Sequence, residues 1–357
     1  MGGCIEINRA DIREGKQVAS EKPEISNGEI LVEIERFALT TNNVTYAAAG
    51  EQLAYWKFFP TGGEQTGIVP VWGFARVTQS KCKDVAPGER FYGFWPLATH
   101  CVLKPGKISD RWFTDTSEHR QKLPPIYNDY NRVPPEGEPA ADDLRALLQP
   151  LLVTSWLLFD FLQDNGWFGA EQILIGSASS KTGLGLAKYL AEARPDVPKI
   201  VGLTSPGNKA FVEGLGACDS VVTYDRIAAE IATVPSVFVD MAGNAEVRSA
   251  LHNHLGGEMK HSAAVGTSHW DKFAPTGDLP GAKPQFFFAP AQVVKRRQEW
   301  GADVVQQKIA DAWQRLARES GSWLTVEHST GLDGALQTWR DLAEGRQRPD
   351  IGHVVVM

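Results

Sequence analysis

Hydrophobic and polar residues alternate with a period of two over several short stretches in the first hundred residues. Such stretches lie at 29–37, 71–78, 90–94 and 97–103. This alternation is typical of strands with one buried face, and the Pro and Gly residues between the stretches indicate turns. We therefore predict a small all-β unit at the start of the chain, a partly open barrel.

The pattern changes between residues 108 and 139. This stretch has little periodicity, and its segment LPPIYNDYNRVPPEGEP contains five prolines. We expect an irregular excursion over the surface, which is either a lid or interface arm or a solvated insertion. Helical spacing then covers 141–162, where we expect Pro150 to bend or divide the helix.

From residue 171 onward, short apolar strands alternate with helical segments. Predicted strands lie at 173–175, 199–203, 220–223, 236–240, 261–265 and 285–288, and predicted helices at 184–190, 206–215, 227–232 and 245–255. This alternation predicts an α/β domain with a parallel, doubly wound sheet. Ligands of such sheets bind beyond the carboxyl ends of the strands. The residues expected along that edge are Ser177 to Thr182, Thr204, Ser205, Tyr224, 241–243 and Gly266 to Ser268.

In the C-terminal part, the spacing of hydrophobic residues predicts one long amphipathic helix over 291–318 and a strand near 324–326. A helix over 332–343 and a final apolar strand over 351–357 follow. The backbone groups of a terminal strand need partners, so we expect this strand to be tied into a sheet.

The segment 171–187, EQILIGSASSKTGLGLA, combines a buried strand, a turn of small and hydroxyl residues, and a helix start. N–H groups at a helix start have no partner inside the helix and carry partial positive charge, so a phosphate can bind there. The spacing departs from G-x-G-x-x-G, so nucleotide binding and an ordinary strand-helix turn are both open. Lys181 and Thr182 match the end of a P-loop, but Ser180 and Ile175 replace its glycines.

The composition indicates a soluble globular protein of two domains. Its 357 residues include 36 basic and 43 acidic residues, a net charge of −7, and no basic block, so nucleic acid is not expected as a partner. No uninterrupted apolar run reaches the roughly 18 residues of a membrane span, and the N-terminus lacks a secretory signal. The four scattered cysteines contain no C-x-x-C pair, so we expect a reducing, cytoplasmic setting.

Several motifs occur in a characteristic order along the chain. They are GEILVEI at 28–34, PGERFYGF at 87–94, LGACDSVVTYD at 215–225, VDMAG at 239–243 and GHVVV at 352–356. This order resembles the medium-chain dehydrogenase/reductase superfamily, and most of all its zinc-lacking quinone oxidoreductase and enoyl reductase branch. The resemblance implies a GroES-like catalytic domain of residues 1–154 and 291–357, with the excursion 108–139, and a Rossmann dinucleotide-binding domain of residues 155–290.

The resemblance also implies NADPH or NADH as the cofactor. The positions that it assigns are Ser177, Ala178, Ser179, Ser180, Lys181 and Thr182 at the pyrophosphate, Ser205, Asn208, Lys209 and Tyr224 at the adenosine end, and Gly243 and Gly266 toward the nicotinamide. NAD specificity normally needs an acid after the second strand, where this chain has Thr204-Ser205-Pro206-Gly207 and no acid before Glu213. We therefore expect NADP(H), although no arginine stands there.

The zinc-containing members of the superfamily need a cysteine near residue 40, a G-H-E motif and a four-cysteine lobe. Here residues 40–43 are Thr-Thr-Asn-Asn, residues 62–64 are Gly-Gly-Glu, and no such lobe exists. A catalytic zinc would lack its thiolate and imidazole ligands, so we predict no metal.

A reductase without zinc needs a group that orients the acceptor and hydrogen-bonds its oxygen. Asn42, Asn43, Thr45 and Tyr46 occupy the loop where the resembled branch places polar groups. We choose Tyr46 for the acceptor oxygen and Asn43 for positioning. The alternative is that the two asparagines cap a helix while Tyr46 is packed away.

The leading hypothesis is a zinc-independent, NADPH-dependent oxidoreductase that transfers hydride to an apolar enone, quinone or ketone. Two alternatives remain: an enzyme of the same fold with diverged chemistry, and a nucleotide-binding protein with little turnover. A P-loop NTPase would need Asp240 as its Mg²⁺ partner. The resemblance implies a homodimer, often formed through edge strands of the Rossmann sheets. Phe286, Phe287 and Phe288 either lie near such an edge or belong to the core.

Overall fold

The computed structural model describes residues 2–267 and 277–357, so Ser268 lies outside the described residues. The chain divides into two compact units. The first comprises residues up to 147 together with 325–357, and the second comprises residues 148–324. The predicted domain boundaries, 154/155 and 290/291, both lie within the second unit and stay a prediction.

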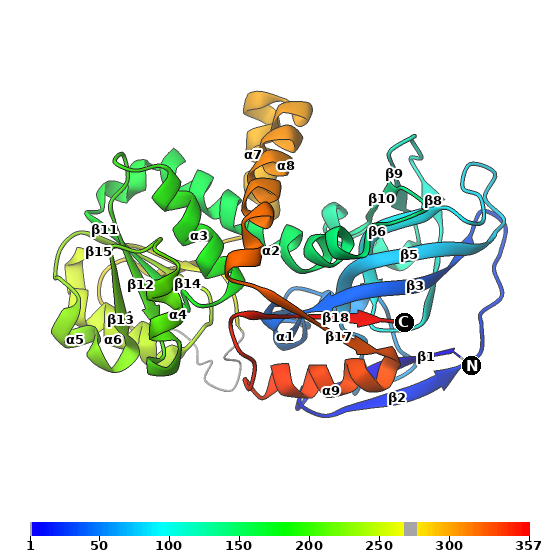
Figure 1. Cartoon of the computed structure of the whole chain (residues 1–357), viewed down its shortest axis with the longest axis horizontal. Helices are drawn as coiled ribbons and strands as arrows, with labels where there is room; N and C mark the ends of the chain where they lie inside the picture. Colours follow the sequence, from blue (N-terminus) through cyan, green and yellow to red (C-terminus); the bar gives the residue numbers. More distant parts are fainter. Residues whose placement is uncertain (1, 268–276) are drawn as a thin grey trace. The chain divides into compact units, whose positions relative to one another are not determined.

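Strands form most of the first unit (Figure 1). A small sheet has the order β2-β1-β4; a larger one has the order β17-β18-β3-β5-β6-β10-β9-β8, and β7 pairs with β3 beside this path. The bounds are β1 Gly2–Asn8, β2 Gly15–Ser20, β3 Ile30–Leu39, β4 Thr66–Gly67, β5 Pro70–Ser80, β6 Arg90–Pro96, β7 His100–Leu103, β8 Pro105–Gly106, β9 Trp112–Asp115, β10 Asp129–Val133, β17 Thr325–Thr330 and β18 Ile351–Val356.

The C-terminal strand β18 is tied into this larger sheet, as its apolar sequence predicts. It pairs antiparallel with β3, where Val355 lies opposite Phe37, and parallel with β17. The helix α9, Gly331–Ala343, lies between β17 and β18 in the chain and contacts β2 and β17. Trp339 of α9 is fully buried, and its Nε1 donates a hydrogen bond to the Ile12 carbonyl over 2.8 Å.

The expectation that segment 108–139 is an irregular excursion is wrong, because much of it is paired into the larger sheet. It contains β9 and β10, which pair antiparallel with each other, and β10 also pairs antiparallel with β6. Phe113 and Tyr130 on these strands are fully buried. The many prolines made this segment look irregular in the sequence, but they lie in the connections that flank the two strands and not in the strands themselves.

The second unit contains a six-stranded, fully parallel sheet of order β13-β12-β11-β14-β15-β16. Numbered within this unit, the order is 3-2-1-4-5-6, the arrangement of a Rossmann fold. The predicted doubly wound sheet is therefore confirmed. The bounds are β11 Gln172–Gly176, β12 Lys199–Thr204, β13 Ser220–Thr223, β14 Ser236–Asp240, β15 Met259–Ala264 and β16 Pro284–Phe286.

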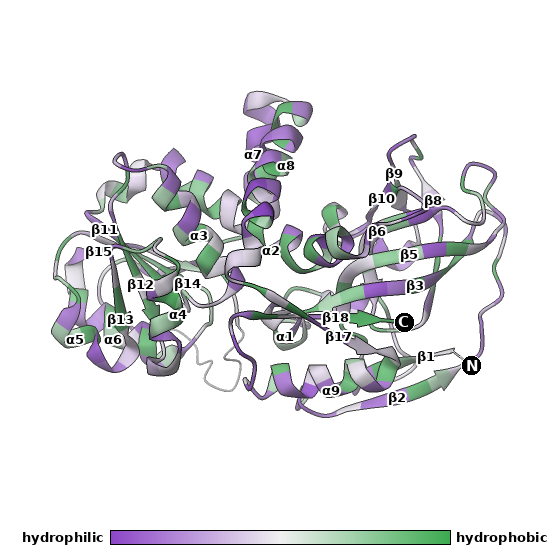
Figure 2. Ribbon diagram, in the orientation of Figure 1, coloured by the Kyte–Doolittle hydropathy of each residue, from purple (hydrophilic) through white to green (hydrophobic). Residues whose placement is uncertain are grey.

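Each face of this sheet buries its own hydrophobic core. Ile173 and Ile175 of β11 pack with α2 and α3, whereas Leu174, between them, packs with α5 and α6. Strands with alternate residues in two cores are apolar in their central positions, and β12 and β14 are coloured largely as hydrophobic (Figure 2). The helices are α2 Pro139–Asp164, α3 Lys181–Glu192, α4 Lys209–Gly214, α5 Ile227–Glu230 and α6 Ala245–Leu255.

Two predicted helices differ from the structure. Helix α2 is a single helix of 26 residues with Pro150 inside it, so Pro150 does not divide it. The predicted helix 291–318 is instead two helices, α7 Ala289–Trp300 and α8 Ala302–Arg318. Gly301 separates them with φ +87°, a left-handed conformation that glycine adopts at low cost.

Helix α2 is also long and apolar enough, by length and composition, to cross a membrane. The sequence interpretation missed this because polar residues interrupt the apolar run at 147–162. Of its most apolar window, 56% is buried inside the structure. A core helix of a soluble protein meets the same criteria, so the helix by itself gives little indication of a membrane.

Candidate functional site

The turn after β11 is held by its own hydroxyl and backbone groups. Ser177 has φ +51°, which is unusual for a residue with a side chain. Its carbonyl accepts a hydrogen bond from the Ser180 N–H over 2.9 Å. Ser180 is the N-cap of α3, and its Oγ accepts from the Gly183 N–H over 3.1 Å. The chain thus turns sharply from β11 so that the start of α3 faces the carboxyl end of the sheet.

Glycine at position 183 is required by this tight turn. A Cβ there would lie 2.5 Å from the Ser177 carbonyl oxygen and 3.1 Å from the Cα of Ala178. Lys181 and Thr182, the first two residues of α3, therefore lie against the turn with little space between helix and strand. Their position at the positive end of the helix dipole suits an anionic group.

Hydroxyl and amide groups connect the turn to the end of the neighbouring strand β12. Thr204 Oγ1 donates to Ser179 Oγ over 3.1 Å, and Asn208 Nδ2 donates to the same oxygen over 3.2 Å. Ser205 follows directly as the cap of a short 3-10 helix, Pro206–Asn208. The first acid after β12 is Glu213. No carboxylate therefore follows β12 at the place where a ribose 2′-hydroxyl is normally recognised.

Lys209 and Tyr224 complete this side of the edge. Lys209 Nζ lies 3.8 Å from Glu213, a pair that is largely exposed and weak in water. Tyr224 follows β13 and reaches toward β11, where its Oη accepts a hydrogen bond from the Ser177 N–H over 3.2 Å. Burial raises the pKa of Tyr224 to about 12, so this phenol is neutral at physiological pH.

Glycines form the edge at the ends of β14 and β15. Gly243 has φ +73°, and a Cβ on it would lie 2.9 Å from the Gly266 carbonyl oxygen. The N–H of Gly243 donates to Asp240 Oδ1 over 2.8 Å. Burial raises the pKa of Asp240, and its Oδ2 lies 3.7 Å from Arg248. The structure thus brings residues from the predicted list together in three places: Ser177 with Tyr224, Ser179 with Asn208, and Gly243 with Gly266.

In the first unit, Tyr46 lies on the helix α1, Thr41–Ala48. Its Oη accepts hydrogen bonds from Asn42 Nδ2 over 2.7 Å and from Trp72 Nε1 over 3.1 Å. The ring packs against Tyr55 and Phe94, with centroid distances of 4.5 and 5.4 Å. Both hydrogen bonds are donated to the phenol oxygen, so the phenol proton is not used by either of them.

The Tyr46 phenol stays protonated over a wide pH range. Burial, reinforced by the nearby Tyr127, raises the pKa of Tyr46 well above its ordinary value. The side chain is 5% exposed. A neutral phenol whose oxygen already accepts two hydrogen bonds can act chemically only as a hydrogen-bond donor.

Asn43, chosen from the sequence for positioning, lies one residue from Asn42 but points elsewhere. Its Oδ1 accepts from the Thr40 N–H over 2.8 Å, and its Nδ2 donates to the Pro70 carbonyl over 2.9 Å. Thr40 is the N-cap, and with Asn43 it forms a capping box. Asn43 therefore fixes the start of α1 and its distance from β5, and the positioning role for it stays a prediction.

Sequence reasoning missed Trp72, and it considered Asn42 without giving it a role. The spacing of Asn42 and Tyr46, four residues apart on one helix, was a usable signal, because such residues face each other. Trp72 comes from β5, and no local pattern connects it with Tyr46. Its contact depends on the pairing of strands that are distant in the chain.

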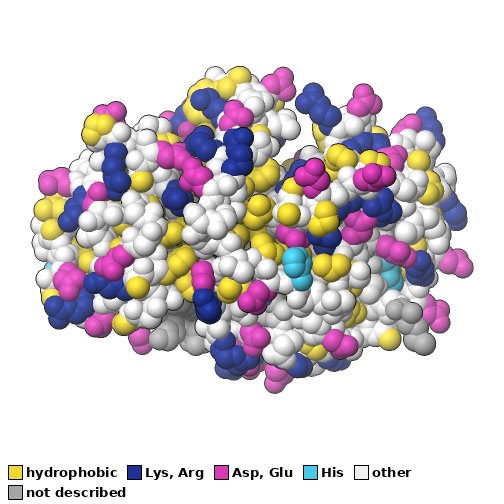
Figure 3. Space-filling model, viewed as in Figure 1, with side chains coloured by type: hydrophobic (Ala, Val, Ile, Leu, Met, Phe, Trp, Pro, Cys, Tyr) yellow, Lys and Arg dark blue, Asp and Glu magenta, His cyan; other side chains and the backbone are white. Residues whose placement is uncertain are grey.

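Charged side chains do not gather by sign on the face drawn in Figure 3, where basic and acidic groups are interspersed. This face offers no extended basic surface for nucleic acid. Among the described residues, no group of three or more His, Cys, Asp or Glu is placed to hold a metal ion.

Known structures share this fold. CurA from Vibrio vulnificus, in complex with NADPH, is 14% identical over 99% of each chain, with a TM-score of 0.65. Mycobacterial Rv1454c, complexed with NADPH, is 14% identical over 100% of each chain, with a TM-score of 0.61. A mutant form of enoyl thioester reductase from Candida tropicalis is 12% identical over 100% of this chain and 99% of that one, with a TM-score of 0.55.

At these identities the likeness establishes the fold, and it confirms the predicted two-domain fold of the medium-chain dehydrogenase/reductase superfamily. No curated protein matches the chain. A family model described as "Protein of unknown function (DUF2855)" matches residues 37–348. The chain therefore belongs to the DUF2855 family and has a medium-chain dehydrogenase/reductase fold.

Proposed function

We propose that this protein is an NADPH-dependent reductase that acts on an activated carbonyl compound, an enone, quinone or ketone. The observation that carries the proposal is the sheet edge around Ser179, Thr204 and Asn208. This edge belongs to a Rossmann sheet, and helix α3 begins beside it. No carboxylate directly follows β12 there, and hydrogen bonds join Ser179 to Thr204 and Asn208. The structural relatives CurA and Rv1454c, both solved with NADPH, support the same cofactor.

The residues at this edge fit a dinucleotide with a 2′-phosphate. Lys181 and Thr182 at the start of α3 would hold the pyrophosphate, assisted by the turn from Ser177 to Ser180 that includes Ala178. Ser205, Asn208, Lys209 and Tyr224 would hold the adenosine end, and Lys209 would supply positive charge for the 2′-phosphate. Gly243 and Gly266 would lie toward the nicotinamide side, where their backbones approach so closely that a Cβ on Gly243 would lie 2.9 Å from the Gly266 carbonyl oxygen.

When bound, NADPH supplies the hydride. Tyr46 donates a hydrogen bond to the carbonyl oxygen of the acceptor, which stabilises the negative charge that develops there. Asn42 and Trp72 hold the phenol oxygen from two sides, and so direct its proton toward the acceptor. Asn43 acts indirectly: it fixes the start of α1, the helix that carries Tyr46. The second hydrogen of the product comes from water as a proton.

We propose that the reaction needs no zinc and takes place in the cytoplasm. Residues 40–43 and 62–64 lack the cysteine and histidine that zinc-containing relatives use, and an uncharged donor, Tyr46, takes over the polarising role. The four cysteines are free thiols in the structure, which suits a reducing compartment.

We also propose a homodimer formed through β16. Among the described residues, this strand is one of the two edges of the parallel sheet, and Phe286 in it and Phe288 just after it are 53% and 36% exposed. An unpaired edge with exposed aromatic residues favours pairing with a second copy. Analytical ultracentrifugation of the wild type and of Phe286→Glu tests this, and a wild type that sediments as a monomer contradicts it.

A screen of enones, quinones and ketones for NADPH oxidation tests the proposed activity. We expect saturable oxidation of NADPH with at least one class, at a higher kcat/KM than with NADH. Mass spectrometry of the product then establishes whether hydrogen was added. Tight NADPH binding without oxidation by any of the three classes contradicts the reductase assignment and favours a nucleotide-binding protein.

A further inference from the structure

Tyr127 brings the segment 108–139 into the ring cluster around Tyr46. Its ring centroid lies 4.7 Å from Phe94, 5.4 Å from Phe58, 5.8 Å from Tyr55 and 6.1 Å from Trp72. Burial raises the pKa of Tyr127 well above its ordinary value, so its phenol is neutral. Tyr127 thus contacts aromatic residues that also contact Tyr46, the proposed donor. Its segment lies outside the part of the chain that carries the superfamily motifs.

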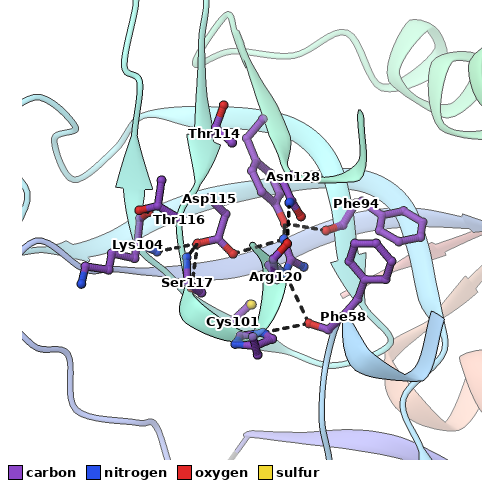
Figure 4. Close-up of polar contacts among 12 residues, drawn as sticks. Phe58, Phe94, Cys101, Lys104, Thr114, Asp115, Thr116, Ser117, Arg120 and Asn128 are labelled. Carbon is purple, nitrogen blue, oxygen red and sulfur yellow. Dashed lines mark hydrogen bonds and ion pairs between the residues drawn. The ribbon is translucent and has the colours of Figure 1, made fainter. Parts of the chain in front are cut away.

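Buried polar contacts brace the segment that carries Tyr127 (Figure 4). Arg120, 1% exposed, donates to Tyr130 Oη over 2.7 Å and to the Phe58 carbonyl over 3.3 Å. It also lies 3.2 Å from Asp115. Asn128, the neighbour of Tyr127, donates to the Arg120 carbonyl over 3.1 Å. These contacts fix the backbone on both sides of Tyr127, so its ring is placed as firmly as a residue of the sheet.

The hydroxyl groups of the cluster leave two protons unused. Tyr127 Oη lies 3.1 Å from Tyr55 Oη, and one of the two donates to the other. Tyr46 Oη accepts two hydrogen bonds. In the described part of the chain these three phenols form no further hydrogen bonds, so one O–H of the Tyr55–Tyr127 pair and the O–H of Tyr46 are available.

Tyr127 is the more exposed residue of the pair. It is partly exposed, whereas Tyr55 is 7% exposed. In the arrangement in which Tyr55 donates to Tyr127, the Tyr127 proton has no other acceptor among the described residues and can be donated to a ligand. Trp72 donates a hydrogen bond to the Tyr46 hydroxyl, and Phe94 packs against the Tyr46 ring. Both residues also pack against the Tyr127 ring, so the two available donors border one aromatic surface.

We propose that Tyr127 is a specificity-determining residue that hydrogen-bonds a second oxygen of the acceptor. The acceptor that fits is a planar conjugated carbonyl compound with another oxygen beyond its reacting carbonyl. Aromatic rings favour the flat body of such a molecule, Tyr46 takes the reacting oxygen, and Tyr127 takes the second. This inference rests on the proposed reductase function. For a quinone, one hydride and one proton from water give the hydroquinone and NADP⁺.

The test compares menadione, which has two carbonyl oxygens, with benzylideneacetone, an aryl enone that has one. The measured quantity is the ratio of kcat/KM for menadione to that for benzylideneacetone. We expect Tyr127→Phe to lower this ratio about tenfold through a higher KM for menadione, the loss expected for one hydrogen bond. Ile126→Ala, the adjacent residue at 38% exposure, is the matched control and should leave the ratio unchanged.

Tyr55→Phe separates recognition from a structural role. This variant retains the Tyr127 hydroxyl, so we expect a smaller decrease in the ratio, about two- to threefold. An unchanged ratio in Tyr127→Phe, equal losses in the two tyrosine variants, or the same loss in Ile126→Ala would each overturn the inference.

Calorimetric titration with menadione keeps this inference distinct from the proposed function. If the wild type oxidises no NADPH with these two compounds or with the ketones of the wider screen, the reductase proposal fails. A menadione Kd that is still about tenfold higher in Tyr127→Phe than in the wild type supports the role of Tyr127. Equal Kd values in the two proteins overturn it.

Discussion

Asn42 Nδ2 donates a hydrogen bond to Tyr46 Oη over 2.7 Å, from one turn earlier on the same helix. Trp72 Nε1 donates to the same oxygen from a different element, over 3.1 Å. Two donors on one phenol oxygen fix its orientation and increase its capacity to donate its own proton. The sequence alternatives of a reactive Tyr46 and a buried Tyr46 are therefore compatible, because the buried phenol still has a proton to donate.

Replacement of Tyr46 by phenylalanine tests this role. We expect Tyr46→Phe to lower kcat about a hundredfold, the usual loss for a donor to a developing oxyanion, with the Kd for NADPH unchanged. Steady-state kinetics and a cofactor titration measure the two effects. Tyr92→Phe is the control, since in the described part of the chain the buried Tyr92 hydroxyl has no hydrogen-bond partner. Equal losses in both variants would contradict a specific role for Tyr46.

The pH dependence of turnover follows from the raised pKa of Tyr46. A phenol donates only when protonated, and a raised pKa extends the protonated form to higher pH. We therefore expect no decrease in kcat from Tyr46 up to about pH 10, the ordinary phenol pKa. A pH profile of kcat in the wild type measures this. An alkaline limb below pH 9 that disappears in Tyr46→Phe would show that the phenol ionises there.

Lys181 is expected to bind the pyrophosphate. Lys181→Ala should raise the Kd for NADPH about tenfold, the value of one charge-assisted hydrogen bond. The free energy of unfolding should change less than this, by under about 1 kcal/mol, since Lys181 lies half-buried at the end of a helix and outside the core. Lys188→Ala, on the same helix and paired with Glu319 at 3.6 Å, is the control. A Kd that Lys181→Ala leaves unchanged would remove the phosphate role.

The Arg120 cluster should be important for stability. Arg120→Ala would leave Asp115 buried without its positive partner, and breaking a buried pair costs about 3–5 kcal/mol. Urea unfolding of the wild type and the variant measures the difference. Lys122→Ala, an exposed position two residues away, should change the free energy of unfolding by less than about 0.5 kcal/mol. A similar small change in Arg120→Ala would show that the cluster is not a structural anchor.

The sequence predicted the Rossmann sheet well because its signals are local. The strand 236–240 and the helix 245–255 have the predicted bounds, and each is a continuous apolar or amphipathic run with clear ends. The strands β9 and β10 were missed because they are short and flanked by prolines. Their stability comes from the pairing of β9 with β10 and of β10 with β6, and from the buried Arg120, and a local pattern shows none of these.

The candidate site was predictable to a similar extent. Motif order placed Ser179 and Asn208 at one sheet edge, where the structure joins them by a hydrogen bond. The Tyr46 partner Trp72 was harder to find, since it lies on β5, and the position of β5 depends on strand pairing in the first unit. The sequence prediction gives the positioning role to Asn43, whereas Asn42 contacts Tyr46 and Asn43 contacts Pro70 in the structure. Adjacent helical residues point in different directions, and the sequence alone does not show which of the two faces Tyr46.

The most direct test of the central claim is a titration of the purified protein with NADPH and with NADH, followed by energy transfer from its tryptophans to the reduced nicotinamide. We predict saturable binding of both, with NADPH bound about tenfold more tightly, and a narrower difference in Lys209→Ala because one phosphate contact is lost. Absence of binding by either dinucleotide would contradict the claim, because the edge around Ser179 and Lys181 would then have no dinucleotide to hold.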